Sequence, residues 1–199
     1  MNGVKESMNS VIENILTRRS IRSFKDQQIT RDELMTILTA GSYAPSGMGM
    51  QSWKFTAIQD TDIMEEVNET MRQTLLAISK EEEAYSYFAP YIHKANDKTT
   101  NFIYHAPTYI LVSNLTDNRN AMADSALALG NMMLAAHSLG LGSCWLNQLP
   151  RLSNFPRMRE FLNQLEIPKE HSVFGSLALG YPAVEAKVAA PRKDVIRII

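Results

Sequence analysis

Cations and hydroxyl groups are concentrated in one short stretch near the N-terminus, residues 17–24 (TRRSIRSF). Arginine guanidinium groups present planar forks of donors that match phosphate oxygens and ring carbonyls. Serine hydroxyls add short donors at the same place. The stretch therefore predicts a subsite for an anionic, oxygen-rich ligand, and the alternative is a solvated basic loop.

A second stretch, residues 44–55 (APSGMGMQSWKF), has the composition of a loop that leads into a strand. Pro45 fixes one backbone dihedral, and Gly47 and Gly49 permit conformations that side chains forbid. Such a loop can bring its backbone amides close to a ligand, although it can also be a plain connector. Two further motifs follow, residues 140–145 (GLGSCW) and residues 179–182 (LGYP) with a later 191–193 (PRK).

In this order the four motifs resemble those of the nitroreductase family of flavin mononucleotide (FMN) enzymes. Those proteins carry an R-x-S-x-[RK]-x-[FY] start and an A-P-S-x-x-N-x-Q-P-W-x-F loop, and the resemblance runs from about Ser7 to the C-terminus. It implies an α+β fold with a central, mostly antiparallel sheet flanked by helices. It also implies one FMN-binding domain over residues 1–199, in an intertwined homodimer that exchanges its C-terminal strands.

The resemblance assigns the FMN phosphate to both ends of the chain. It places Arg18 and Ser20 on the phosphate, joined by Arg192 and Lys193 from the tail, while Arg19 adds charge or points to solvent.

The resemblance also assigns the flavin ring. Arg22 matches the family's cation at the pyrimidine edge, where a positive charge stabilises the reduced flavin, and Gln51 suits the same edge. The loop residues expected to line the cofactor, from this subunit or its partner, are Pro45, Ser46, Gly47 and Gly49. A backbone amide of the loop Leu146-Asn147-Gln148 is expected to face flavin N5.

Three positions depart from the family pattern. Gly49 stands where the family has Asn, Ser52 where it has Pro, and Gln148 where it often has Gly. These departures leave the phosphate subsite intact but change how the ring is positioned.

Hydrophobic periodicity predicts the elements that carry these motifs. We expect helices over residues 8–16, 61–79 and 121–139. A further helix is expected to begin at a capping box at 30–33 and to stop at Gly41. Residues 150–165 are expected to form a loop, which starts at Pro150, and then a short helix, which ends at Leu165. Strands are expected over residues 53–59, 107–113, 143–146 and 173–179.

Three segments are not assigned to a single-chain core by the sequence alone. Residues 80–105 carry an aromatic cluster, which is either core or a lid-like flap over a planar substrate. The helix over 121–139 is apolar on nearly all sides, which favours burial against a second subunit. The apolar tail 194–199 is expected to pair with a sheet, the partner's by resemblance.

Composition excludes several classes of function. The chain has 199 residues, 45% of them hydrophobic and 21% charged, and a net charge of −1, so no bulk field points to nucleic acid or a membrane. A lone cysteine, Cys144, and an N-terminus without an apolar segment predict a reducing, cytoplasmic location. The four histidines show no metal spacing, and we expect no metal, no hydrolase triad and no separate dinucleotide domain.

The implied activity is that of an FMN-dependent oxidoreductase. NADH or NADPH, as a transient co-substrate, would reduce the flavin, and a nitroaromatic, quinone or similar small acceptor would then reoxidise it by a ping-pong mechanism. No catalytic side chain is expected, because the flavin does the chemistry. The alternatives are a specialised family member, which performs reductive dehalogenation or flavin breakdown, and a non-catalytic flavin-binding or sensor protein.

Overall fold

The structure is a computed structural model that describes residues 9–78, 83–190, 192 and 196–199. The elements within these residues are α1 (Ser10–Thr17), α2 (Arg31–Ser42), the short 3-10 helix η1 (Gly47–Gly49), β1 (Lys54–Ile58), α3 (Thr61–Leu76), α4 (Tyr85–Ala95), β2 (Thr108–Leu115), α5 (Ala121–Ser138), β3 (Gly142–Leu146), α6 (Gln148–Leu152), α7 (Pro156–Gln164) and β4 (His171–Gly180).

A four-stranded antiparallel sheet in the order β1-β2-β4-β3 forms the centre of the molecule. Its middle strands are almost completely buried. Along β2 the side chains alternate as the pleat requires. Tyr109 and Leu111 enter one hydrophobic cluster, whereas Ile110 and Val112 enter the other. The expected α+β architecture with an antiparallel sheet is confirmed.

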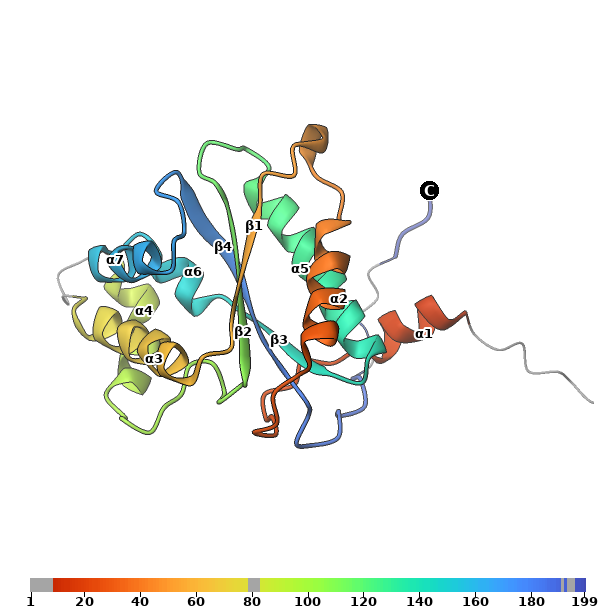
Figure 1. The fold of residues 1–199 in the computed structure, drawn as a ribbon, viewed down its shortest axis with the longest axis horizontal. Helices are drawn as coiled ribbons and strands as arrows, with labels where there is room; N and C mark the ends of the chain where they lie inside the picture. Colours follow the sequence, from red (N-terminus) through yellow and green to blue (C-terminus); the bar gives the residue numbers. More distant parts are fainter. Residues whose placement is uncertain (1–8, 79–82, 191, 193–195) are drawn as a thin grey trace, which may run out of the picture.

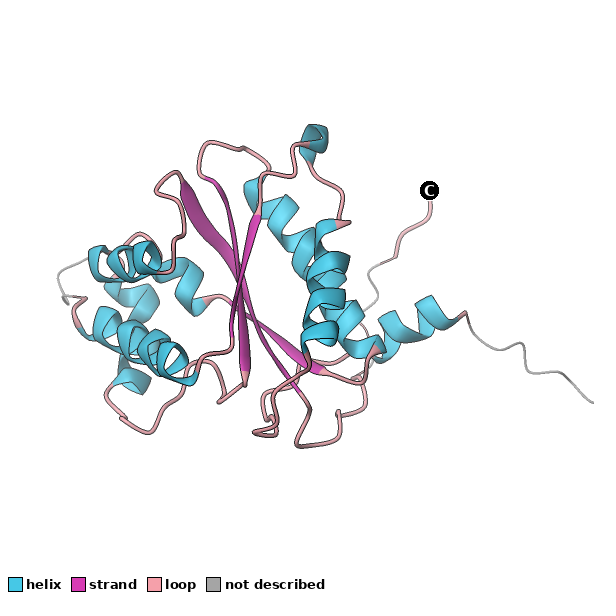
Figure 2. Ribbon diagram, viewed as in Figure 1, coloured by secondary structure: helices cyan, strands magenta, loops and turns pink. Residues whose placement is uncertain are grey.

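Helices cover both faces of this sheet (Figures 1 and 2). The helices α3, α4, α6 and α7 lie together on one face, and α2 and α5 lie on the other, with α1 beyond them. No helix in the described part of the chain is long and apolar enough to cross a membrane.

The capping box that starts α2 is present as predicted. The Glu33 backbone N–H donates to Thr30 Oγ1, and the Thr30 N–H donates to the Glu33 carboxylate. The predicted stop at Gly41 is confirmed to within one residue, since α2 ends at Ser42; Gly41 itself is buried against Met132 of α5. The glycine is needed for this close approach of two helices, since a Cβ would collide with the methionine side chain.

The aromatic segment after α3 contributes to the core of this chain. Phe88 of α4 is buried and makes an edge-to-face contact with Phe155, whereas Tyr87 is exposed beneath the Arg151 guanidinium. Part of the expected lid, residues 79–82, lies outside the described residues. That this excursion covers a ligand remains a prediction.

One element near the C-terminus differs from expectation. Residues 148–152 and 156–164 form the two helices α6 and α7, so the loop predicted at Pro150 is wrong and the proline lies within α6. Residues 196–199 are exposed in the single chain, residues 194 and 195 lie outside the described residues, and pairing of the tail with a partner's sheet stays a prediction. The C-terminus lies on the side of α1, α2 and α5 (Figure 1).

Candidate functional site

Backbone hydrogen bonds bring three of the four sequence motifs together. The Ile21 N–H donates to the Ser143 carbonyl at 3.0 Å, so the arginine-rich segment lies along the edge of β3. The Lys25 N–H donates to the Tyr181 carbonyl at 2.9 Å, and Phe24 forms a bridge to Pro182. Residues from both ends of the chain therefore meet beside β3, although sequence alone could not pair them.

Cys144 of β3 follows Ser143, which the arginine-rich segment contacts through its backbone. Burial raises the pKa of the Cys144 thiol, while the charges of Arg22 and Arg18 and hydrogen bonding to Arg22 and Ser20 oppose that rise. The thiol is buried, as predicted for a structural cysteine.

Arg18 has unused hydrogen-bonding capacity. Its guanidinium is partly buried, and Nη1 is fully covered without a hydrogen-bond partner among the described residues. A covered charged donor without a partner is costly unless a ligand satisfies it. Arg18 is therefore the strongest candidate in this segment for contact with an anion.

Arg19 has a local structural contact instead. Its Nη1 donates to the carbonyls of Leu16 and Arg18 at 2.8 and 2.6 Å, at the C-terminal end of α1. A cation at this end of a helix satisfies free carbonyls and complements the helix dipole. Arg19 was expected either to add charge at the phosphate or to point to solvent. The structure instead shows its guanidinium bonded to the end of α1.

Arg22 is exposed and lies over the ring of Tyr104, with 6.0 Å between Cζ and the ring centroid. Tyr104 and His105 both have positive φ, 59° and 52°. The Asn101 side chain holds this turn, since its Oδ1 accepts from the N–H groups of Ile103 and His105. Sequence reasoning missed Tyr104, because no local pattern connects it with Arg22.

A hollow of about 410 Å³ lies beside the arginine segment. Its lining includes three cationic side chains, Arg18, Arg19 and Lys25, together with His137 and the acidic Glu185. Burial lowers the pKa of His137, and the positive charges of Arg18 and Arg19 lower it further. Cationic side chains thus line this hollow at the C-terminal ends of α1 and α5.

The glycine-containing loop has the unusual backbone that its sequence predicts. Gly49 has a φ of 67°, and Met48 and Gln51 also have positive φ. The Ser46 hydroxyl accepts from the Gln51 N–H at 3.0 Å and closes the loop, while Pro45 and Gln51 are exposed. This loop lies at one end of α2, and residues 18–24 lie at the other (Figure 1). One chain does not bring the two segments together.

Buried side chains hold the end of β3. The Ser176 hydroxyl donates to the Leu146 carbonyl at 2.8 Å and accepts from the Tyr109 hydroxyl at 2.7 Å. The Trp145 indole N–H donates to Asn147 Oδ1 at 2.6 Å. The predicted loop after β3 is therefore fixed through both its backbone and its side chain.

The remaining predicted residues are Gln148 of α6, which is half-buried, and two residues of the tail. Gln148, at the first position of α6, has a covered Oε1 without a hydrogen-bond partner among the described residues. Arg192 is exposed, and no hydrogen bond joins it to another described residue. Lys193 lies outside the described residues. The contribution of the tail to the phosphate subsite remains a prediction.

Comparison with known proteins identifies relatives along nearly the whole chain. The model of the nitroreductase family matches residues 15–181. A provisionally named NADH dehydrogenase/NAD(P)H nitroreductase of Archaeoglobus fulgidus is 31% identical over 180 residues, which are 89% of this chain and 88% of the relative. An iodotyrosine deiodinase of Thermotoga neapolitana is 26% identical over 90% of this chain and 91% of its own length.

Solved structures give the same result. The crystal structure of a nitroreductase with bound FMN from Bacteroides fragilis is 38% identical and superposes with a TM-score of 0.88. The match covers 96% of this chain and 100% of that chain.

Proposed function

Because the chain belongs to the nitroreductase family, we propose that it is an FMN-dependent oxidoreductase. It takes reducing equivalents from NADH or NADPH and passes them to a small electron-poor acceptor such as a nitroaromatic or a quinone. Relatives with NAD(P)H nitroreductase activity in their names and a similar structure with bound FMN support this proposal.

The observation that carries the proposal is a set of three polar atoms at expected cofactor positions, Arg18 Nη1, Arg19 Nε and Gln148 Oε1, which are covered and have no hydrogen-bond partner among the described residues. Arg18 Nη1 offers a donor suited to a phosphate oxygen, and Gln148 Oε1 offers an acceptor suited to a ring N–H. The chain thus has donors and acceptors that fit FMN at both ends of the candidate site.

Each group then has a defined task. Arg18 and Ser20 hold the phosphate, and Arg22 places its positive charge at the pyrimidine edge, backed by the Tyr104 ring. The turn at Asn147, held by the contacts of Trp145 and Ser176, would supply a backbone N–H group to the flavin ring. Bound FMN supplies the redox chemistry, and the protein supplies placement and electrostatics.

We further propose that the active form is a homodimer built on α1 and α5. Several large apolar side chains on these helices are exposed in the single chain: Val11, Ile12, Ile15 and Leu16 of α1, and Met122 and Leu127 of α5. Helix α1 has no buried residue at all. Apolar surface on this scale favours association with a second copy.

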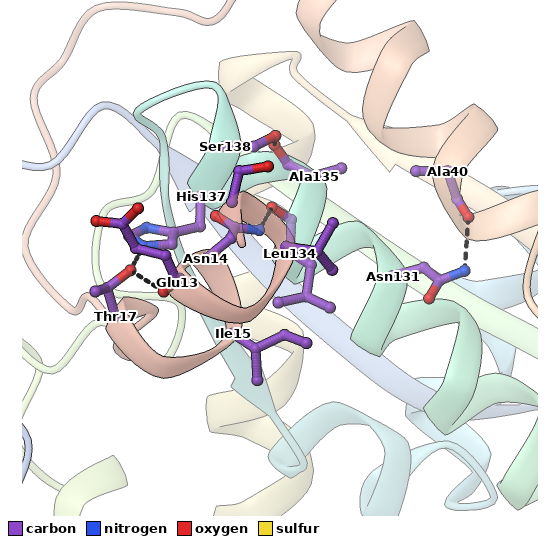
Figure 3. Close-up of a pocket in the computed structure, with 12 residues that line it drawn as sticks. Glu13, Asn14, Ile15, Thr17, Ala40, Asn131, Leu134, Ala135, His137 and Ser138 are labelled. Atoms are coloured by element: carbon purple, nitrogen blue, oxygen red, sulfur yellow. Dashed lines mark hydrogen bonds between the residues drawn. The ribbon is translucent and has the colours of Figure 1, made fainter. Parts of the chain in front are cut away.

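A groove of about 640 Å³ runs between α1 and α5 on the same side (Figure 3). Its walls are held by the Asn14 amide, which donates to the Leu134 carbonyl, and by the Thr17–His137 contact of 2.9 Å. Ile15 and Leu134 supply apolar lining. The groove fits a surface that a partner covers.

The dimer also accounts for two segments that a single chain leaves apart. The loop 44–52 lies far along α2 from Arg18, so in a dimer it can serve the partner's flavin. Ile196, Ile198 and Ile199 are exposed apolar residues on the tail. Pairing of this tail with the partner's sheet would bury them and satisfy the edge of that sheet.

Cofactor titration tests the phosphate assignment directly. Arg18→Ala should weaken FMN binding by about 1.5–3 kcal/mol, the range for a hydrogen bond to a charged group, which is roughly a 10- to 150-fold rise in Kd. Arg157→Ala, at an exposed position on α7, is the matched control and should leave the Kd unchanged. A wild-type protein that stays colourless after reconstitution with excess FMN contradicts the proposed function.

The acceptor is tested by reoxidation of the NAD(P)H-reduced protein. Rapid oxidation by a nitroaromatic or quinone is the expected result. Faster oxidation by a halotyrosine, with release of halide, would instead assign the chain to the reductive dehalogenation suggested by the deiodinase relative.

A further inference from the structure

We infer that Asp124 is a positioning residue that fixes the loop 44–52 to the start of α5. It thereby fixes the position of residues 46–51, the part of the loop proposed to contact the flavin. The inference rests on the proposed function, since it assigns the loop to the cofactor, but the anchoring itself can be measured without FMN.

The Asp124 carboxylate is buried and bonded to the loop. It is 2% exposed, its Oδ1 accepts from the Gly47 N–H at 2.9 Å, and its Oδ2 accepts from Asn118 Nδ2 at 3.2 Å. A carboxylate so far from water needs such donors. The backbone of Gly47 is thereby tied to the first turn of α5.

The same cluster holds the other end of the loop. Ser52 Oγ accepts from Asn118 Nδ2 at 3.1 Å and donates to Asn114 Oδ1 at 2.7 Å. Asn114 belongs to β2 and is completely buried. The loop is therefore clamped at both ends onto one polar network that joins β2 to α5.

This network explains one departure from the family pattern. The family's proline at the position of Ser52 has no hydroxyl, whereas the serine uses its hydroxyl to connect Asn114 with Asn118. The restraint that proline supplies through its ring is here supplied by hydrogen bonds. Ser52 therefore belongs to the same positioning unit as Asp124.

The loop needs such a clamp because its backbone is strained. Met48 and Gln51 have φ values of 55° and 46°, which residues with side chains seldom adopt. Strained conformations persist only where surrounding contacts hold them. At Gly47 the fit is also close, since a Cβ there would collide with the Asn120 side chain.

A purely structural role for Asp124 makes a different prediction. An acidic residue in the first turn stabilises a helix through its dipole, and its loss would then lower only the stability of α5. A positioning role requires that loss of Asp124 frees the loop and weakens FMN binding while the fold remains intact. It also links the loop to the helix proposed as the dimer core.

The test compares Asp124→Ala with Asp117→Ala. Asp117 is exposed in the same β2–α5 connection, and no side-chain hydrogen bond joins it to another described residue, so it is the matched control. Two quantities are measured: amide hydrogen exchange of residues 44–52 in the apoprotein, and the Kd for FMN by fluorescence titration. Circular dichroism and sedimentation verify fold and association state.

For Asp124→Ala we expect amide exchange in the loop to accelerate about tenfold or more. We also expect the Kd for FMN to rise about tenfold or more, because the loss of one hydrogen bond to a charged group has an effect of this size. Asp117→Ala should change neither. Unchanged exchange and Kd in a folded Asp124→Ala protein would overturn the inference.

A second variant covers the case in which Asp124→Ala does not fold. Ser52→Ala removes only the hydroxyl that joins Asn114 to Asn118, and it should accelerate exchange at the C-terminal end of the loop and raise the Kd. Wild-type behaviour of Ser52→Ala in both measurements would then overturn the inference. If the wild-type protein binds no FMN, the proposed function and the flavin part of the inference fall together, whereas exchange in the apoprotein still decides the anchoring.

Discussion

Replacement of Arg72 by methionine should destabilise the protein strongly, although Arg72 lies far along the sequence from every motif. The side chain is 6% exposed and belongs to α3. Its guanidinium donates to four backbone carbonyls of the segment after α4, those of Ala95, Asp97, Lys98 and Thr100, at 2.8, 2.7, 3.3 and 2.7 Å. Methionine fills similar space but donates no hydrogen bond.

The size of the stability loss depends on whether each of the four carbonyls can form a replacement hydrogen bond with water. The Ala95 carbonyl is bonded within the buried interior and would be left without a partner, a cost of about 1–3 kcal/mol. The other three bonds are partly exposed, so water can replace much of their contribution. We therefore expect a loss of about 3 kcal/mol, which for a chain of this size lowers Tm by roughly 6–12 °C.

Thermal unfolding of the apoprotein at a fixed chain concentration measures this loss, since bound FMN and association both shift Tm. Arg151→Met is the control, because Arg151 is exposed and its guanidinium lies over the Tyr87 ring, 4.5 Å from the centroid. It should cost no more than about 1 kcal/mol. If Arg72→Met lowers Tm no more than Arg151→Met does, the reasoning that the guanidinium holds this segment is refuted.

Two further predictions concern buried polar groups. Ser176→Ala should lower the free energy of unfolding in urea by about 1–3 kcal/mol, because the buried Tyr109 hydroxyl loses its acceptor and the Leu146 carbonyl loses a donor. The double variant with Tyr109→Phe should recover part of that loss. Additive losses from the two substitutions would contradict the explanation. Burial lowers the pKa of His171 below its ordinary value of 6.5, and Lys54 lowers it further. As the pH falls, His171 therefore becomes protonated in the unfolded chain before it does so in the folded protein. The contribution of neutral His171 to stability should be fully present above about pH 6.5 and decline as the pH falls from there toward the folded pKa. His171→Asn should flatten this part of a Tm–pH profile, and an unchanged slope would show that other groups cause it.

The elements of the fold could be predicted from sequence because local patterns determine them. The apolar run at 107–113 and the capping box at Thr30 correspond to β2 and to the start of α2. The order of the strands in the sheet and the meeting of Ile21 with Ser143 depend on contacts between distant segments, which no local pattern encodes. Gly41 shows the limit clearly, since the sequence predicts the helix end there but not the close packing of this glycine against Met132 of another helix.

For the candidate site, the sequence could likewise predict one part and not the other. The motif residues could be chosen from their types and from the family resemblance, but not the residues that hold them. Tyr104, Asp124 and Ser176 each act through a contact with a residue far away in the sequence. Their roles depend on burial and on the neighbours that folding provides, and neither is visible in a linear pattern.

The position of β4 in the sheet has a consequence for synthesis on the ribosome. It lies between β2 and β3, although it follows both of them in the sequence. The four-stranded sheet therefore cannot close until residues 171–180 have been translated. The arginine segment at residues 18–24 must wait for its partners Ser143 and Tyr181. Until β4 is made, β2 and β3 lack the strand that lies between them, and a requirement for such distant pairing slows folding.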